Sequence, residues 1–242
     1  MTMSADQWIL WQGLGLELNA TIAFTWLVMA ILVIGSLAVT ARLSDDTHPS
    51  RWQSLLEVIV TGIADQIRDI GARDPSRYLP FIGTLFLFIA TANLLAVVPG
   101  YMPPTGSLST TTALAIAVLV AVPAYGIAKT GVRPYLQNYA RPTLFMLPFN
   151  VIGELSRTIA LAVRLYGNVM SGTVIVGILI SIAPFFFPII MQLLGMLTGL
   201  IQAYIFAVLA TVYIASATRS YSGPDDVSKP RKEEPRPWTP SG

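Results

Sequence analysis

The feature that most constrains this chain is the absence of charge over three long stretches. No Asp, Glu, Lys or Arg occurs from Ala20 to Val39, from Tyr78 to Ala128, or from Leu165 to Thr218. A transmembrane helix needs about 20 predominantly apolar residues. Because each stretch is long enough to cross a bilayer at least once, the chain is predicted to be a polytopic membrane protein.

Composition agrees with this class. Hydrophobic residues make up 54% of the sequence and charged residues 12%, against about 25% charged residues in a soluble domain. The net charge of +2 is too small to indicate nucleic-acid binding. The chain has no cysteine, and its one histidine, His48, lies in a polar stretch, so no disulfide, metal site or cofactor is expected.

The apolar stretches divide into five predicted membrane helices, at residues 20–39, 79–98, 108–128, 143–181 and 186–218. Between the first two, apolar residues recur at helical spacing among charged ones, at Leu55, Val58, Ile59, Ile63 and Ile67. This pattern predicts an amphipathic helix along the membrane interface. The predicted fold class is therefore an all-α polytopic membrane protein with five membrane helices and one interfacial helix.

Lysine and arginine occupy alternate connections. They lie between the first and second predicted spans, between the third and fourth, and after the last, while residues 1–19 have none. Cytoplasmic connections carry the excess of these residues, so residues 1–19 are expected outside and the C-terminus inside. Residues 20–221 would form one membrane domain. The charged, Pro-rich stretch 222–242 has too few apolar residues to fold and is predicted to be a disordered cytoplasmic tail.

Arg164 is the charge least expected in such a sequence. An ionised side chain in hydrocarbon costs roughly 2.5 kcal/mol or more, and arginine cannot lose its proton. Arg157 points within about 20° of Arg164 on a helix of 3.6 residues per turn, and Glu154 and Asn168 extend the same polar line. Arg164 is the predicted functional centre, since intramembrane charges are functional candidates. Glu154 and Arg157 also suit a simple ion pair near the start of the helix.

Further polar side chains occur in other predicted spans, with Gln202 and Tyr213 on the last long helix and Asn93 in the second span. An amide that faced lipid would be costly, so Gln202 is expected to face protein or water. We expect it to face Arg164 across the two long helices, where each would satisfy the other. For Gln202 and Asn93, a plain interhelical hydrogen bond is the alternative.

Two motifs connect the chain with a known family. RLYGNVMSG at 164–172 and IQAYIFAVLATVYIA at 201–215 resemble the corresponding segments of subunit a of the F-type ATP synthase. The similarity extends upstream through LLEVIVTGIADQIRDI, TANLLAVVPG and GSLSTTTALA, in the expected order over residues 18–218.

The resemblance implies a non-catalytic stator subunit that moves protons beside a rotating ring of c subunits. Two offset aqueous half-channels would lead to the ring carboxylates, and the long helix pair would lie tilted along the ring. Arg164 matches the family's essential arginine, which would release the ion from each arriving carboxylate and block leakage. The resemblance also implies peripheral-stalk b subunits, the rest of the complex and a bacterial inner membrane. The expected ion pathway contains Glu154, Arg157, Asn168, Gln202, Asn93 and Tyr213.

The chain departs from the commonest bacterial pattern, which leaves the ion open. Many members have Glu at the position of Thr173, some have His at that of Gly195, and many have Asp at that of Ala96 or Ser107. The outer half-channel is therefore short of titratable groups. Proton relays benefit from such groups, whereas hydroxyl and amide oxygens also suit Na⁺, so Na⁺ is the alternative ion.

A secondary transporter that binds an anionic solute at Arg164 is the alternative from another class. That class predicts internal repeats and discontinuous helices. No repeat relates residues 20–128 to residues 143–218. A purely structural scaffold would leave Arg164 unexplained, so the rotary stator is the leading interpretation.

Overall fold

The structure is a computed structural model. It describes residues 9–13, 16–41, 51–70, 75–98, 100–139, 146–182 and 187–219. The predicted tail at 222–242 lies outside the described residues, as do the first eight residues of the predicted external N-terminus.

The prediction of five long apolar helices is confirmed. They are α1 (Ala20–Thr40), α3 (Pro75–Leu94), α4 (Leu108–Thr130), α6 (Met146–Ile182) and α7 (Phe187–Arg219), and each is long and apolar enough to cross a membrane. A helix satisfies its own backbone hydrogen bonds, which is the requirement for a chain that crosses hydrocarbon. Two short 3-10 turns, η2 (Leu95–Val97) and η3 (Pro104–Gly106), connect α3 to α4.

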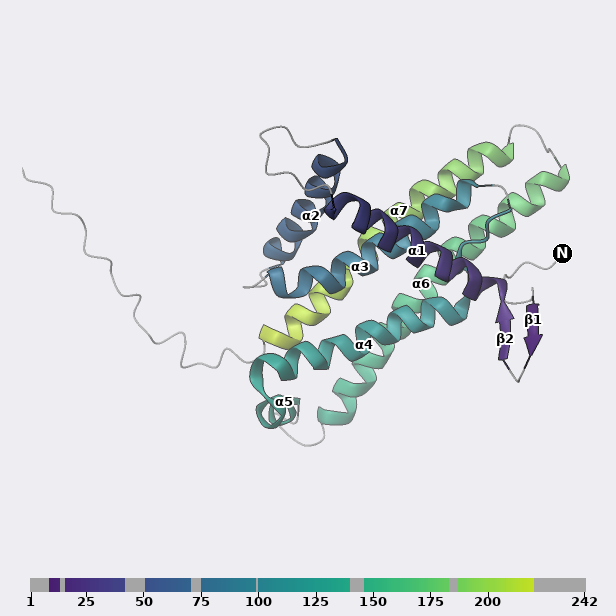
Figure 1. Ribbon diagram of the computed structural model, residues 1–242. Helices are drawn as coiled ribbons and strands as arrows, with labels where there is room; N and C mark the ends of the chain where they lie inside the picture. The colour runs from purple at the N-terminus through teal and green to yellow at the C-terminus, as the bar shows by residue number, and fades with distance from the viewer. Residues whose placement is uncertain are drawn as a thin grey trace, which may run out of the picture.

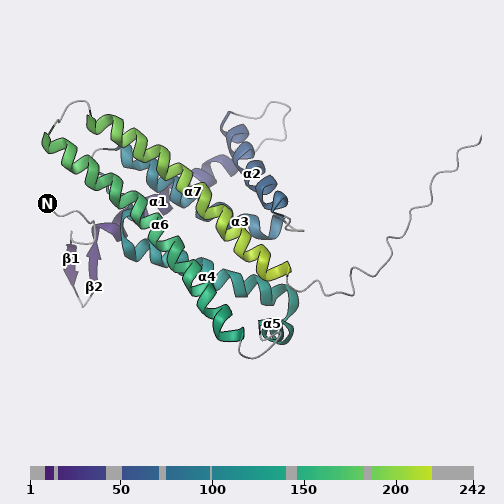
Figure 2. The same cartoon turned by 180° about the vertical axis from the view of Figure 1, so that it is seen from behind.

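The long helices form one packed bundle. α7 packs against α3, α4 and α6, α4 also packs against α6, and α1 crosses the bundle on the α3 side (Figure 1). The core side chains include Ile82 and Ile89 of α3, Leu165 of α6, and Phe206 and Ile214 of α7. Figure 2 shows α6 and α7 side by side and antiparallel, with no other helix in front of them.

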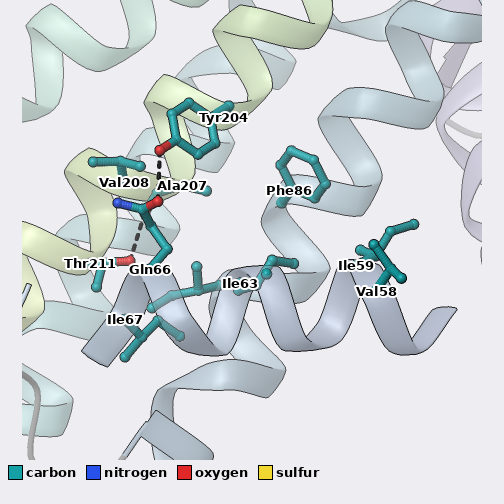
Figure 3. A pocket seen from close by; sticks show the side chains of 12 residues that line it. Val58, Ile59, Ile63, Gln66, Ile67, Phe86, Tyr204, Ala207, Val208 and Thr211 are labelled. Atoms are coloured by element: carbon teal, nitrogen blue, oxygen red, sulfur yellow. Dashed lines mark hydrogen bonds between the residues drawn. The ribbon is translucent and has the colours of Figure 1, made fainter. Parts of the chain in front are cut away.

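The amphipathic helix forms as predicted, as α2 (Arg51–Asp69), and it projects at an angle from the bundle (Figure 1). Ile67 is fully buried, whereas Val58, which shares the predicted apolar pattern, is 72% exposed. α2 therefore docks mainly through its C-terminal half. There α2, α3 and α7 border a cavity of about 260 Å³, where the Tyr204 hydroxyl donates a hydrogen bond of 2.7 Å to Gln66 Oε1 (Figure 3).

Three short elements were not predicted from the sequence. β1 (Ile9–Gly13) and β2 (Leu16–Asn19) pair antiparallel just before α1. α5 (Val132–Tyr139) lies in the connection with Lys and Arg between the third and fourth predicted spans, where no helix was predicted. Pro134 falls in the first turn of α5, where proline is tolerated because that N–H has no helical partner. Tertiary packing on α4 and α6 supports α5, and a sequence pattern of eight residues does not report such packing.

The docking of α5 gives a test. A Cβ added at Gly126 of α4 would lie 2.5 Å from the Tyr135 ring, so the ring or the helix backbone would have to move. We expect Gly126→Ala to displace α5 and to cost about 1–3 kcal/mol of stability, as overpacking does. Hydrogen exchange should increase over residues 132–139. Gly83→Ala on α3 is the matched control, because nothing lies within 4 Å of the added carbon. Equal exchange in the two variants would contradict this packing.

Candidate functional site

Arg164 lies on the outer surface of the bundle. Its neighbours Leu161 and Leu165 are buried and hold α6 against the core, while the Arg164 side chain is exposed. It makes no hydrogen bond or ion pair with any residue that the structure describes. Of the five apolar spans, α6 is the least covered, with 6% of an apolar stretch of 18 residues buried, against 17% to 39% in the corresponding stretches of the others. The guanidinium therefore points away from the chain, on the helix that the chain itself covers least.

A hydrogen bond between the two long helices shows which of their residues lie at the same depth. Asn168 Nδ2 of α6 donates to the Thr198 carbonyl of α7 at 3.2 Å. Arg164 lies four residues before Asn168, and Gln202 lies four residues after Thr198. Because α6 and α7 are antiparallel, these two steps of four residues run in the same direction along the bundle. Each step covers about 6 Å at 1.5 Å per residue. Arg164 and Gln202 are thus at a similar depth in the bundle, but no hydrogen bond joins them in the described part of the chain, so the predicted mutual satisfaction is not observed.

Gln202 is buried and unsatisfied. The residue is 5% exposed, and its Nε2 atom is buried without a hydrogen-bond partner among the described residues. Buried polar atoms almost always have a partner in the protein or in ordered water. The alternative of a plain interhelical hydrogen bond through Gln202 is not observed in the described part of the chain. The orphan amide instead marks a place for water or for another polar group.

Asn93, by contrast, has both of its amide atoms bonded to protein. Its Nδ2 donates to the Gly199 carbonyl of α7 at 3.0 Å, and its Oδ1 accepts a hydrogen bond of 2.9 Å from the Thr105 hydroxyl. The side chain therefore connects α3, η3 and α7, which is the interhelical hydrogen bond that the sequence left as the alternative.

Glu154 and Arg157 do not form the ion pair that their spacing allowed. The only ion pair among the described residues joins Arg68 to Asp65 on α2. The Arg157 guanidinium instead lies over the Tyr213 ring of α7, 5.7 Å from its centroid. Glu154 is half-buried one turn away. The structure thus brings Arg157 and Tyr213 together from two helices, through a contact that sequence spacing within one helix could not reveal.

Several polar residues of the site region were missed at the sequence level. Gln192 of α7 donates through Nε2 to the Ala96 carbonyl of η2. The Gln192 amide in an uncharged stretch was a usable signal, whereas Thr105, a single threonine in a loop rich in Pro and Gly, offered none. The Tyr101 hydroxyl, between the spans, is buried without a partner among the described residues, and burial raises the pKa of Tyr101. In the described ranges no three His, Cys, Asp or Glu side chains gather to hold a metal.

Comparison with known proteins gives a single family. The family model for the ATP synthase A chain matches residues 22–215. A protein of Acaryochloris marina, "ATP synthase subunit a 2", is 64% identical over 90% of this chain and 94% of its own length. "ATP synthase subunit a" of Albidiferax ferrireducens is 57% identical over 98% of each chain. "ATP synthase subunit a 1" of Chlorobaculum parvum is 60% identical over 91% of this chain and 97% of its own.

The contact of Arg157 with Tyr213 generates a prediction for stability. A cation over an aromatic ring is worth about 0.5–1 kcal/mol at an exposed site. We expect Tyr213→Leu to lower the free energy of unfolding of the wild-type protein. The loss should be about 0.5–1 kcal/mol larger than the loss that the same substitution causes in Arg157→Met, which has no guanidinium over the ring. Tyr213→Phe keeps an aromatic face and should retain the coupling. A double-mutant cycle on thermal unfolding measures it, and zero coupling between the two positions would contradict the contact.

Proposed function

The chain belongs to the ATP synthase A chain family and acts as its stator subunit a, and we propose that Arg164 is the residue through which it conducts protons with the c-ring. The observation that carries this proposal is the exposed guanidinium, without a partner among the described residues, on the least covered apolar helix. A charge in hydrocarbon costs roughly 2.5–3.5 kcal/mol without a partner. Since this chain supplies none among the described residues, a carboxylate of a neighbouring subunit is the fitting partner.

The chemistry of that encounter follows from electrostatics. A fixed cation favours the ionised form of a nearby carboxylate and lowers its pKa. A protonated ring carboxylate that approaches Arg164 would therefore release its proton, and would bind another when rotation carries it away. Arg164 would also repel a proton that crossed without a carrier. Arginine suits this role because it stays charged at all working pH values.

Water beside Gln202 would supply the other part of the path. Gln202 lies at a similar depth to Arg164, and its buried amide has no protein partner in the described part of the chain. We assign Gln202 and Asn168 to the ion pathway at the level of Arg164. Arg157, Tyr213 and the half-buried Glu154 occupy the N-terminal part of α6 and the C-terminal part of α7, and we assign them to the inner half-channel.

The surroundings of the subunit are part of the proposal. The uncovered face of α6 and α7 in Figure 2 suits a ring of c subunits. Peripheral-stalk b subunits and the rest of the complex would bind elsewhere on the chain. The distribution of Lys and Arg supports a bacterial inner membrane protein with its N-terminus outside and its C-terminus in the cytoplasm.

The central test replaces the guanidinium. We expect Arg164→Ala to abolish ATP-driven proton uptake by vesicles, while the complex still assembles with its c-ring. Arg164→Lys should also show little proton uptake, because a compact ammonium lacks the planar, delocalised set of donors of a guanidinium. Dye-quenching assays of proton uptake, scaled to the amount of c-ring that copurifies, measure both variants. Normal pumping by Arg164→Ala vesicles would refute the proposed function.

Glu154 gives a second test. If its carboxylate passes protons in the inner half-channel, Glu154→Gln should slow uptake and shift its pH optimum without loss of assembly. Uptake rates over a pH series, again per assembled complex, make the comparison. Asp65→Asn serves as the control. It also removes one carboxylate, but from α2, which is not assigned to the ion pathway. A wild-type rate and pH profile in Glu154→Gln would remove Glu154 from the pathway.

A further inference from the structure

One turn of α7 is held by side-chain amides from two other helices. Asn168 of α6 donates to the Thr198 carbonyl, and Asn93 of α3 donates to the next carbonyl, that of Gly199. The two acceptors are consecutive backbone groups of one helix. A side-chain hydrogen bond to a backbone carbonyl fixes a helix along its axis, which apolar packing does only weakly because apolar contacts are not directional.

The orientation of the Asn93 amide is determined by its partners. A backbone carbonyl can only accept, so the Gly199 oxygen requires the Nδ2 end of Asn93. The Thr105 hydroxyl must then donate to Oδ1, as the 2.9 Å contact shows. Asn93 is 4% exposed and Thr105 is 0% exposed, so neither exchanges this partner for bulk water. The Gly199 carbonyl thus sets the direction of the Asn93 amide, and Thr105 supplies the hydrogen-bond donor that its buried Oδ1 needs in that orientation.

Glycine at 199 is what allows this contact. A Cβ on Gly199 would lie 2.9 Å from both Cβ and Cγ of Asn93, a distance that side-chain carbons do not adopt. The helix backbone of α7 therefore approaches Asn93 more closely than any other residue type at 199 would permit. The close approach and the hydrogen bond both join Asn93 of α3 to Gly199 of α7.

We infer that Asn93, whose Oδ1 is satisfied by Thr105, is a positioning residue that fixes the depth of α7 and so places Gln202 level with Arg164. Gln202 follows Gly199 by three residues, less than one turn, so a shift of this turn moves the Gln202 amide with it. The inference rests on the proposed function of Arg164 and Gln202. It assigns Asn93 a role through Gln202, with no contact to the moving ion.

The test compares two substitutions of similar size at Thr105. Thr105→Val keeps the volume and removes the hydroxyl, whereas Thr105→Ser keeps the hydroxyl and removes a methyl group. Positioning through the hydrogen bond predicts loss of proton uptake in Thr105→Val and retention in Thr105→Ser. We expect Asn93→Ala and Thr105→Val to lower uptake per assembled complex by about tenfold or more, because small misplacements at a reacting centre cost up to about a hundredfold.

Tyr204→Phe is the matched control. It removes another hydrogen bond between α7 and a neighbouring helix, the one to Gln66, and should leave uptake per complex unchanged. Proton uptake at the wild-type rate in Asn93→Ala would overturn the inference. Higher uptake in Thr105→Val than in Thr105→Ser would also overturn it, because that order indicates that Thr105 acts through packing. Arg164→Ala is measured alongside. If Arg164→Ala loses uptake while Asn93→Ala keeps full activity, the positioning role of Asn93 is refuted and the proposed function of Arg164 is not.

Discussion

The structure depends on one constraint, that hydrocarbon offers no hydrogen-bond partner to a buried polar group. Long helices satisfy their own backbone, and this is why five of them make up most of the described chain. The same constraint applies to side chains within the spans. Asn93 and Asn168 meet it by donating to carbonyls of α7, and Gln192 does so at η2. Each of these bonds satisfies a polar group and also fixes one helix relative to another.

Arg164 and Gln202 are two side chains of the site that do not meet the constraint within the described chain. Arg164 is exposed on α6 and the Gln202 amide is buried in the bundle, each without a partner among the residues that the structure describes. In the proposed function, a carboxylate of a neighbouring subunit would be the partner of Arg164, and water would be the partner of Gln202. The subunit is incomplete at this depth by itself, which fits a protein that works against a moving partner.

Much of the fold could be predicted because its determinants are local. The uncharged stretches marked α1, α3, α4, α6 and α7, and the spacing of Ile63 and Ile67 marked α2. Local sequence was less informative where structure depends on packing. α5 forms from eight residues whose helix is supported by α4 and α6, and the β1–β2 hairpin was not recognised. The Glu154–Arg157 pair was allowed by spacing, yet Arg157 lies over Tyr213, a residue 56 positions away in another helix.

The sequence by itself determined which residues are chemically exceptional, because a charge or an amide in an apolar stretch is visible without coordinates. Arg164, Gln202 and Asn93 were all found in this way. Only the tertiary structure decided which of them have partners. Asn93 is satisfied through Gly199 and Thr105, while Arg164 and Gln202 remain without partners in the described chain. The physical reason is that a hydrogen bond depends on distance and direction between atoms of different helices, and the packing of the bundle, with a glycine at its closest approach, sets both.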